Sequence, residues 1–175
     1  MPPIDFISAL GQLLSDGALR DALAADPGAV AARLNLRESD RAALVQLVPA
    51  DLEFQADILL RKRFGLVRRI IPETCRSLGA EAWPLFRAYA RHHAVARESS
   101  GARDAHDFCL DLHQHRPAGL CQAERNRLHF AFSQSRFALH LIRRRPAPWQ
   151  CPRALQFFLR LGRRRWREMT FYVRA

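Results

Sequence analysis

The chain has 175 residues, of which 49% are hydrophobic, so it is long enough to bury a core of its own. Its formal net charge is +11, and its four widely spaced cysteines do not form the dense pattern of a small disulfide-stapled secreted protein. The uncharged apolar runs are far shorter than the roughly 18 residues that a membrane-spanning helix needs, so no membrane partner or span is expected. No basic segment precedes an apolar stretch at the start, so no secretory signal is predicted and the cytoplasm is the expected compartment.

Charge is unevenly distributed along the chain. Residues 1–57 contain nine acidic and four basic side chains, whereas residues 125–175 contain thirteen arginines and one acid, Glu168. Nearly all of the positive charge is arginine, whose planar fork suits carboxylates and phosphates, since Lys62 is the only lysine. The basic C-terminal region therefore calls for a binding function.

The first third of the chain is predicted to form short helices. Apolar residues recur at helical spacing from Phe6, and Ser15-Asp16-Gly17 separates them from a second helix. Asp26 is a suitable N-cap before Pro27, which fits the first helical position because no amide donor is needed there. Ser39 is the predicted N-cap of a fourth helix.

A longer helix is predicted after Pro49, because apolar residues keep to one face for about six turns until Pro72 ends it. A further helix is predicted around Pro84. The opposite face of the long helix is basic and is expected either to be solvated or to contact a partner enzyme; it carries Arg61, Lys62, Arg68 and Arg69.

The small polar stretch SSGARD is predicted as an internal boundary, which gives a helical domain of residues 1–98 and a second domain of residues 99–175. Within the second domain, Asp104 is the predicted N-cap of a helix that runs through His113. Another helix is predicted from Cys121 to about Ser133.

After that helix the apolar period changes from helical spacing to alternation. Three segments, around Leu139, Phe157 and Phe171, alternate apolar with other residues, which is typical of strands. Gly162 favours a hairpin between the last two, whereas the first segment could equally prolong the preceding helix. The sequence thus predicts an α+β protein, in which a helical bundle over residues 5 to about 133 precedes a small antiparallel sheet of two or three strands.

One cluster has the residue types of a metal site. His106, Cys109 and His113 are spaced three and four apart, so they share a helical face, and Cys121 could complete a tetrahedral set. The spacing matches no standard zinc motif, and Leu110 shares the same face. Surface histidines and a buried thiol are the favoured interpretation, so no metal site is predicted.

No catalytic motif is found. The sequence has no GxSxG, no phosphate-binding glycine loop and no HExxH, and the basic region has almost no carboxylates. The chain is therefore predicted not to be an enzyme by itself.

Three interpretations of the basic C-terminal region remain. Arginines with interleaved aromatic residues could bind nucleic acid, but no basic recognition helix is present and half of the aromatic residues in strands must face inward. The open edge of a terminal strand could instead accept an extended peptide, with flanking arginines selecting acidic side chains. The third interpretation is a solvated hairpin whose charges prevent edge-to-edge aggregation.

The region from LLSDGALRDALAADP through LNLRESDRAALVQL and LLRKRFGLVRRIIPETCRSLG to WPLFRAYARHH resembles a known family. It is similar to the small helical accessory domain found beside, or fused to, multinuclear non-haem iron oxidative enzymes that modify ribosomally made peptides, as in methanobactin and thiaglutamate biosynthesis. A looser match continues through the basic strands, while residues 99–135 match weakly. The resemblance is one of helix patterns rather than of catalytic motifs.

This resemblance implies a heterodimer with a TIM-barrel iron enzyme, in which the accessory chain captures the leader of a precursor peptide and presents its cysteine-containing core. Iron would belong to the partner enzyme, and no cofactor or metal ligand is expected on this chain. The alternative function is a DNA-binding regulatory protein. The residues expected to contact an acidic leader are Arg160, Arg163, Arg164, Arg165 and Arg167, with Phe171 and Tyr172 in the docking strand, and the residues expected to face the enzyme are Arg61, Lys62, Arg68 and Arg69.

Overall fold

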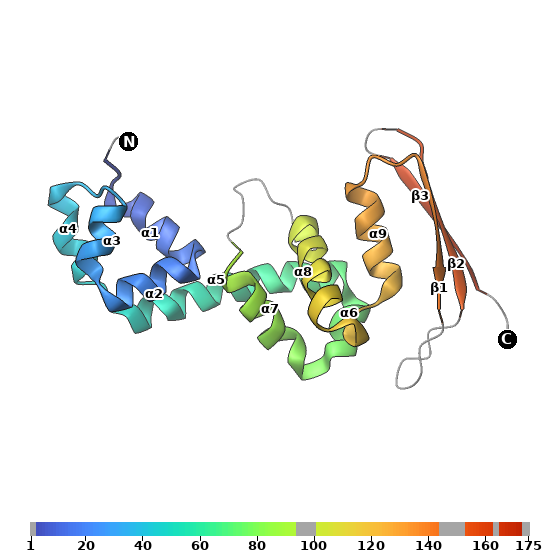
Figure 1. The fold of residues 1–175 in the computed structure, drawn as a ribbon, viewed down its shortest axis with the longest axis horizontal. Coiled ribbons are helices and arrows are strands. Elements are labelled where there is room, and N and C mark those ends of the chain that lie inside the picture. Colours follow the sequence, from blue (N-terminus) through green and yellow to red (C-terminus); the bar gives the residue numbers. More distant parts are fainter. Residues whose placement is uncertain (1–2, 94–100, 144–152, 163–164, 173–175) are drawn as a thin grey trace. The chain divides into compact units, whose positions relative to one another are not determined.

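A computed structural model describes residues 3–93, 101–143, 153–162 and 165–172 (Figure 1). The helices are followed by a three-stranded antiparallel sheet, which confirms the predicted α+β class. Within the described ranges, no helix combines the length and the apolar character needed to cross a membrane. The elements are α1 (Phe6–Ser15), α2 (Gly17–Ala25), α3 (Pro27–Arg33), α4 (Glu38–Val45), α5 (Pro49–Ile70), α6 (Pro72–Leu78), η1 (Gly79–Glu81), α7 (Ala82–Arg91), α8 (Gly101–His115), η2 (Pro117–Gly119), α9 (Gln122–Phe132), β1 (Phe137–Ile142), β2 (Ala154–Arg160) and β3 (Trp166–Tyr172).

The chain separates into two compact units. The first comprises residues 1–66 and 83–100, and the second comprises residues 67–82 and 101–175. The units interleave in sequence because residues 67–82 belong with the C-terminal part. The domain division at residue 99 inferred from the sequence stays a prediction.

Aspartate caps and an apolar core build the first unit. Asp5, Asp16 and Asp26 cap α1, α2 and α3 by accepting amide hydrogen bonds between 2.8 and 3.1 Å long, and Pro27 begins α3 as predicted. Much of the acidic character of this region therefore has a structural role. One cluster of its buried apolar side chains consists of Ala9, Leu13, Leu19, Leu23, Val30, Ala31, Leu34, Leu36, Leu44 and Leu52.

The predicted cap at Ser39 is wrong. Helix α4 begins at Glu38, and its N-cap, Arg37, makes no side-chain capping bond. A backbone bridge fixes this start, since the Arg37 amide donates to the Ile4 carbonyl at 3.2 Å and Asn35 takes a left-handed φ of 50°. The Ser39 hydroxyl donates instead to Asp40.

Two further helix boundaries differ from the sequence prediction. Pro72 ends α5 as expected, but it also begins α6, a short helix that the apolar pattern did not reveal. Asp104 is not an N-cap, because α8 already begins at Gly101 and Asp104 lies buried within its first turn.

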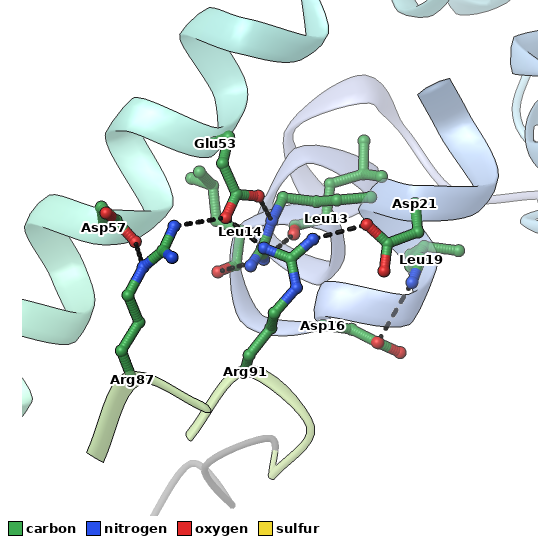
Figure 2. Close-up of polar contacts among 10 residues, drawn as sticks. Leu13, Leu14, Asp16, Leu19, Asp21, Glu53, Asp57, Arg87 and Arg91 are labelled. Carbon is green, nitrogen blue, oxygen red and sulfur yellow. Dashed lines mark hydrogen bonds and ion pairs between the residues drawn. The ribbon is translucent and has the colours of Figure 1, made fainter. Parts of the chain in front are cut away.

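An ion cluster around Glu53 joins α2, α5 and α7 within the first unit (Figure 2). The Arg20 side chain is 5% exposed; its Nε donates to Glu53 at 2.8 Å, and its Nη1 donates to the Leu13 and Leu14 carbonyls at 2.9 and 3.2 Å. Arg87 and Arg91 also bind Glu53. The cluster is completed by Asp57, which pairs with Arg87 at 2.7 Å, and Asp21, which pairs with Arg91.

Gly17 is needed where α7 approaches the start of α2. A Cβ at this position would lie 2.4 Å from the Arg91 Cγ and 2.6 Å from the Arg91 carbonyl oxygen. Any larger residue would therefore push apart the two helices that the Glu53 cluster holds together.

In the second unit, Glu124 joins α9 to α6. Its carboxylate is 4% exposed and accepts hydrogen bonds from the Glu73 and Thr74 amides, both at 2.8 Å, at the start of α6. The Thr74 hydroxyl oxygen accepts from the Cys121 amide at 3.1 Å. These contacts satisfy donors at two helix starts and position α9 for its contact with the sheet.

The three strands form an antiparallel sheet in the order β1-β2-β3, and α9 covers one of its faces (Figure 1). Three aromatic rings fill this contact: Phe130 of α9 stacks on Phe158 of β2 with centroids 5.0 Å apart, and Trp166 of β3 contacts both. The segment around Leu139 is a strand, which decides between the two interpretations of its sequence.

Removing the Glu53 carboxylate should destabilise the first unit. We expect Glu53→Ala to lower the free energy of unfolding by about 2–4 kcal/mol, because Arg20 would remain buried without its counter-charge. The matched control is Glu38→Ala, which breaks the exposed pair with Arg41 and should cost less than about 0.5 kcal/mol. Urea unfolding of both variants measures the difference, and similar losses would contradict a structural role for the cluster.

Candidate functional site

The strand register sorts the side chains of the sheet onto two faces. Leu139, Phe157 and Met169 lie opposite one another, so they share the face that points away from α9. This outer face is apolar over its whole middle and carries Phe137, Leu139, Leu141, Leu155, Phe157, Leu159, Met169 and Phe171. The inner face, which packs on α9, is the more polar of the two.

A polar contact on the inner face fixes this arrangement. The Gln156 side chain is fully buried, accepts from the Asn126 amide at 3.1 Å, and donates to the Ala123 carbonyl and to Glu168 at 3.2 and 2.9 Å. Glu168 also accepts two bonds from the Arg127 guanidinium, at 2.6 and 3.1 Å. The bidentate pair joins β3 to α9 and neutralises the only acid of the basic region.

The environment keeps Glu168 ionised. Burial by itself raises the pKa of a carboxyl, but hydrogen bonds from Arg127 and Gln156 and the charge of Arg127 outweigh that effect, and the net pKa lies below its usual value. On the same face, His140 has a buried Nε2 with no hydrogen-bond partner among the described residues, and burial lowers its pKa.

The hydrogen-bond pattern shows which backbone groups β3 leaves at its outer edge. The Leu161 amide donates to the Arg165 carbonyl at 2.9 Å, so this pair is a hydrogen-bonded one. Because hydrogen-bonded and non-hydrogen-bonded pairs alternate in an antiparallel ladder, Met169 and other odd-numbered β3 residues bond to β2. Glu168 and Thr170 therefore direct their N–H and C=O groups outward, and no described strand pairs with that edge.

The opposite edge of the sheet is partly occupied. The Gln122 side chain donates to the Leu141 carbonyl at 3.1 Å and accepts from the Arg143 amide at 3.4 Å, which uses two groups that β1 directs outward. A strand added beside β1 would have to displace Gln122. Of the two edges, that of β3 is the more accessible.

The structure separates the five arginines expected to contact a peptide. Arg165 and Arg167 are exposed at the start of β3, whereas Arg163 and Arg164 lie outside the described residues. Arg160 binds the end of α9: its guanidinium donates to the Phe130, Ser133 and Ser135 carbonyls and lies 5.0 Å from the Phe130 ring centroid. This geometry gives Arg160 a structural role that the sequence did not reveal.

The two aromatic residues of the predicted docking strand lie on different faces. Phe171 belongs to the apolar outer face and Tyr172 to the inner face, and they are 57% and 68% exposed. Both are thus accessible near the end of β3, although one peptide side chain could not contact both.

Arg61, Lys62, Arg68 and Arg69 are all exposed on α5. Arg61 lies over the Trp83 ring, 4.5 Å from its centroid, and Trp83 also contacts Phe64. Their assignment to an enzyme interface stays a prediction.

The histidine and cysteine cluster of α8 does not form a metal site. Among the described residues, no group of three or more His, Cys, Asp or Glu side chains is placed to hold an ion. His113 contacts Arg125, and His106 contacts Asp107 and packs on the Phe132 ring. The side chains that share a helical face in sequence therefore have separate partners.

The buried thiols are also unsuited to catalysis. Neither Cys75 nor Cys109 forms a disulfide. Burial, reinforced by the charge of Glu124, raises the pKa of Cys75 to about 11 and that of Cys109 to about 12. Both are protonated at neutral pH and are poor nucleophiles.

The residues that orient the sheet were not identified from the sequence. Gln156 carried a usable signal, since a lone amide side chain in the middle of an apolar strand needs a hydrogen-bonding partner when it is buried. Gln122 carried no such signal, because a glutamine in the first turn of a surface helix is ordinary.

Residues 46–114 are similar to the family described as "SCO6045-like, C-terminal domain". The match covers less than half of the chain, from before α5 to near the end of α8, and it does not include the sheet. No curated protein and no solved structure shows a significant match.

The Glu168 contact should make stability fall in acid. Because its pKa is lower in the folded chain, Glu168 contributes stability above its unfolded pKa of about 4.5, and this contribution is lost as pH falls through the folded value. We expect Glu168→Gln to be less stable than the natural chain at pH 7 and to show a smaller loss of stability between about pH 5 and pH 3. Thermal unfolding at a series of pH values measures the stability of both chains. The same pH dependence of stability in both would contradict a stabilising role for the Glu168 contact.

Amide exchange should alternate along β3. The Met169 and Phe171 amides donate to β2, whereas the Glu168 and Thr170 amides face outward, so the first two should exchange about tenfold or more slowly than the others. Residue-resolved hydrogen exchange by NMR measures the four rates. Equal protection of all four amides would mean that the outer edge of β3 is already paired.

Proposed function

We propose that this chain is the non-catalytic partner subunit of an iron-dependent peptide-modifying oxidase. In this role it binds the leader of a precursor peptide and presents the peptide's core, expected to contain cysteine, to the partner's metal centre. The observation that carries the proposal is the outer edge of β3, where Glu168 and Thr170 offer backbone hydrogen bonds beside two exposed arginines.

Strand addition is the binding mode that this edge supports. An extended peptide placed beside β3 would gain main-chain hydrogen bonds without displacing any described residue, whereas Gln122 stands in the way at β1. Main-chain bonding alone is indifferent to sequence, so selection must come from side chains at the edge.

The side chains along β3 define the expected peptide. On the outer face, successive positions are Arg167, Met169 and Phe171. A bound strand would therefore place an acidic residue beside Arg167 and apolar residues two and four positions farther along, because side chains on one face recur every second residue. Arg165 would add a second cation near the acidic end of the peptide.

In this proposal the partner enzyme oxidises the peptide and this chain only binds it. Its described part places no ligand set for a metal, and its buried thiols are protonated, which favours a binding role. The exposed cations of α5, Arg61, Lys62, Arg68 and Arg69, would contact the enzyme. They lie within the residues that are similar to the SCO6045-like family, which is compatible with an accessory role.

Thr170→Pro tests the docking edge. Proline removes the outward N–H of Thr170 and puts a ring at the edge, but it removes no bond to β2. We expect leader binding, measured by fluorescence anisotropy with the labelled precursor, to weaken about tenfold or more. Thr170→Val is the matched control, because it also lacks the hydroxyl but keeps the N–H.

Coexpression with the products of neighbouring genes supplies the second measurement. A stable complex that oxidises the precursor only when this chain is present would support the proposal, and Thr170→Pro should lower that rate. Full activity of the enzyme alone would overturn it. Tight duplex DNA binding with a steep salt dependence, and no copurifying partner, would favour the DNA-binding alternative instead.

A further inference from the structure

The outer face of the sheet is an apolar surface that no described element covers. Six of its apolar side chains, and Leu161 just beyond β2, have 37–68% of their surface accessible. A contiguous apolar patch of this kind marks an interaction surface in a folded protein. This surface is distinct from the backbone edge of β3, since it uses side chains of all three strands.

Charge is confined to the two ends of this face. Continuing the alternation of each strand, Arg143 and Arg153 lie on the outer side at one end, and Arg165 and Arg167 lie there at the other. All four arginines are exposed, and among the described residues none of them has a carboxylate partner. The only acid of the sheet, Glu168, is on the inner face with Arg127.

The dimensions of the face correspond to one α-helix. Three strands about 4.8 Å apart make a face about 10 Å wide, and seven residues make it about 20 Å long. A helix with its side chains is about 10 Å across and rises about 1.5 Å per residue, so about 14 residues would cover the face. The inner face already has this type of cover, since α9 packs on it.

A second copy of the chain fits poorly. Two such faces in a symmetric dimer would bring together two sets of arginines with no carboxylate between them. By these dimensions the face also spans only about 200 Å², well below the roughly 800 Å² per partner of a stable interface. The charges therefore favour an occupant that carries carboxylates.

We propose that the outer face of the sheet docks a single amphipathic helix of another protein, with an apolar stripe over the middle and acidic side chains near both ends. The stripe contacts the leucine and phenylalanine side chains, and the carboxylates pair with Arg143, Arg153, Arg165 and Arg167. This inference does not rest on the leader-binding proposal, because the helix would pack on side chains of all three strands and would use none of the outward backbone groups of β3. Arg165, Arg167, Met169 and Phe171 belong to both proposed sites.

A designed peptide tests the inference on the full chain. The probe is a fluorescein-labelled 14-residue helix with leucine at i, i+3, i+4, i+7 and i+8, glutamate near both ends and glutamine elsewhere. A second peptide has lysine in place of glutamate, and a third has a central proline that prevents helix formation. We expect the second and third peptides to bind about tenfold or more weakly than the first in fluorescence anisotropy.

Substitutions on the chain locate the site. Leu139→Thr combined with Met169→Thr places a strand-forming residue at both positions and removes apolar surface there, and should weaken binding of the first peptide about tenfold or more. Phe54→Gln is the matched control, because Phe54 is a 64% exposed apolar side chain on α5 in the first unit and is not part of the sheet. Thr170→Pro should leave helix binding unchanged, which separates this surface from the docking edge.

Several outcomes would overturn the inference. Equal binding of the lysine peptide would remove the role of the arginines, and equal binding of the proline peptide would show that the occupant is not helical. Absence of binding by the first peptide would show that the face does not accept such a helix. A concentration-dependent dimer in sedimentation, lost in the Leu139→Thr, Met169→Thr variant, would identify a second copy as the occupant.

Discussion

The contact among Gln156, Glu168 and Arg127 decides which side of the sheet lies on α9. Side chains of a strand alternate between faces, so a slip of one residue in the register would turn Phe157 and Met169 inward and Gln156 outward. The buried amide and the bidentate ion pair exclude that slip, because either group would lose its partners. The sheet consequently packs its more polar face on its own helix and leaves its more apolar face accessible. The same register directs the Glu168 and Thr170 backbone groups outward.

The two edges of the sheet differ in how side chains shield their backbone groups. An open edge invites pairing with another chain, and natural proteins shield such edges with side chains or charge. Gln122 shields part of the β1 edge, whereas no described strand pairs with the β3 edge and the exposed Arg165 and Arg167 lie at the start of that strand. Charge of one sign discourages pairing between two copies of the chain but attracts an acidic segment. An edge of this kind is suited to binding an acidic segment of another protein rather than to self-association.

The acidic and basic parts of the sequence differ in how their charges are used. In the first unit, Asp5, Asp16 and Asp26 cap helices, and Glu53 has three arginine contacts, so these acids are engaged within the fold. In the sheet, Arg127 and Arg160 are engaged in the same way, but Arg165 and Arg167 remain at the surface. Within the described part of the sheet, the positive charge that is accessible for binding is therefore smaller than the composition suggests, and it lies near the ends of the strands.

The sequence by itself determined the fold class, the cap at Asp26, the end of α5 at Pro72 and the presence of the strands, because periodicity and local capping depend on neighbours in the chain. It placed the wrong cap at Ser39, because a backbone bridge from Ile4 sets the start of α4, and it missed the start of α8 at Gly101. Alternation showed that each strand has two faces, but not which face would be buried. Only the tertiary structure decided that, and with it the free edge and the structural role of Arg160, because these depend on pairing between segments that lie far apart in the chain.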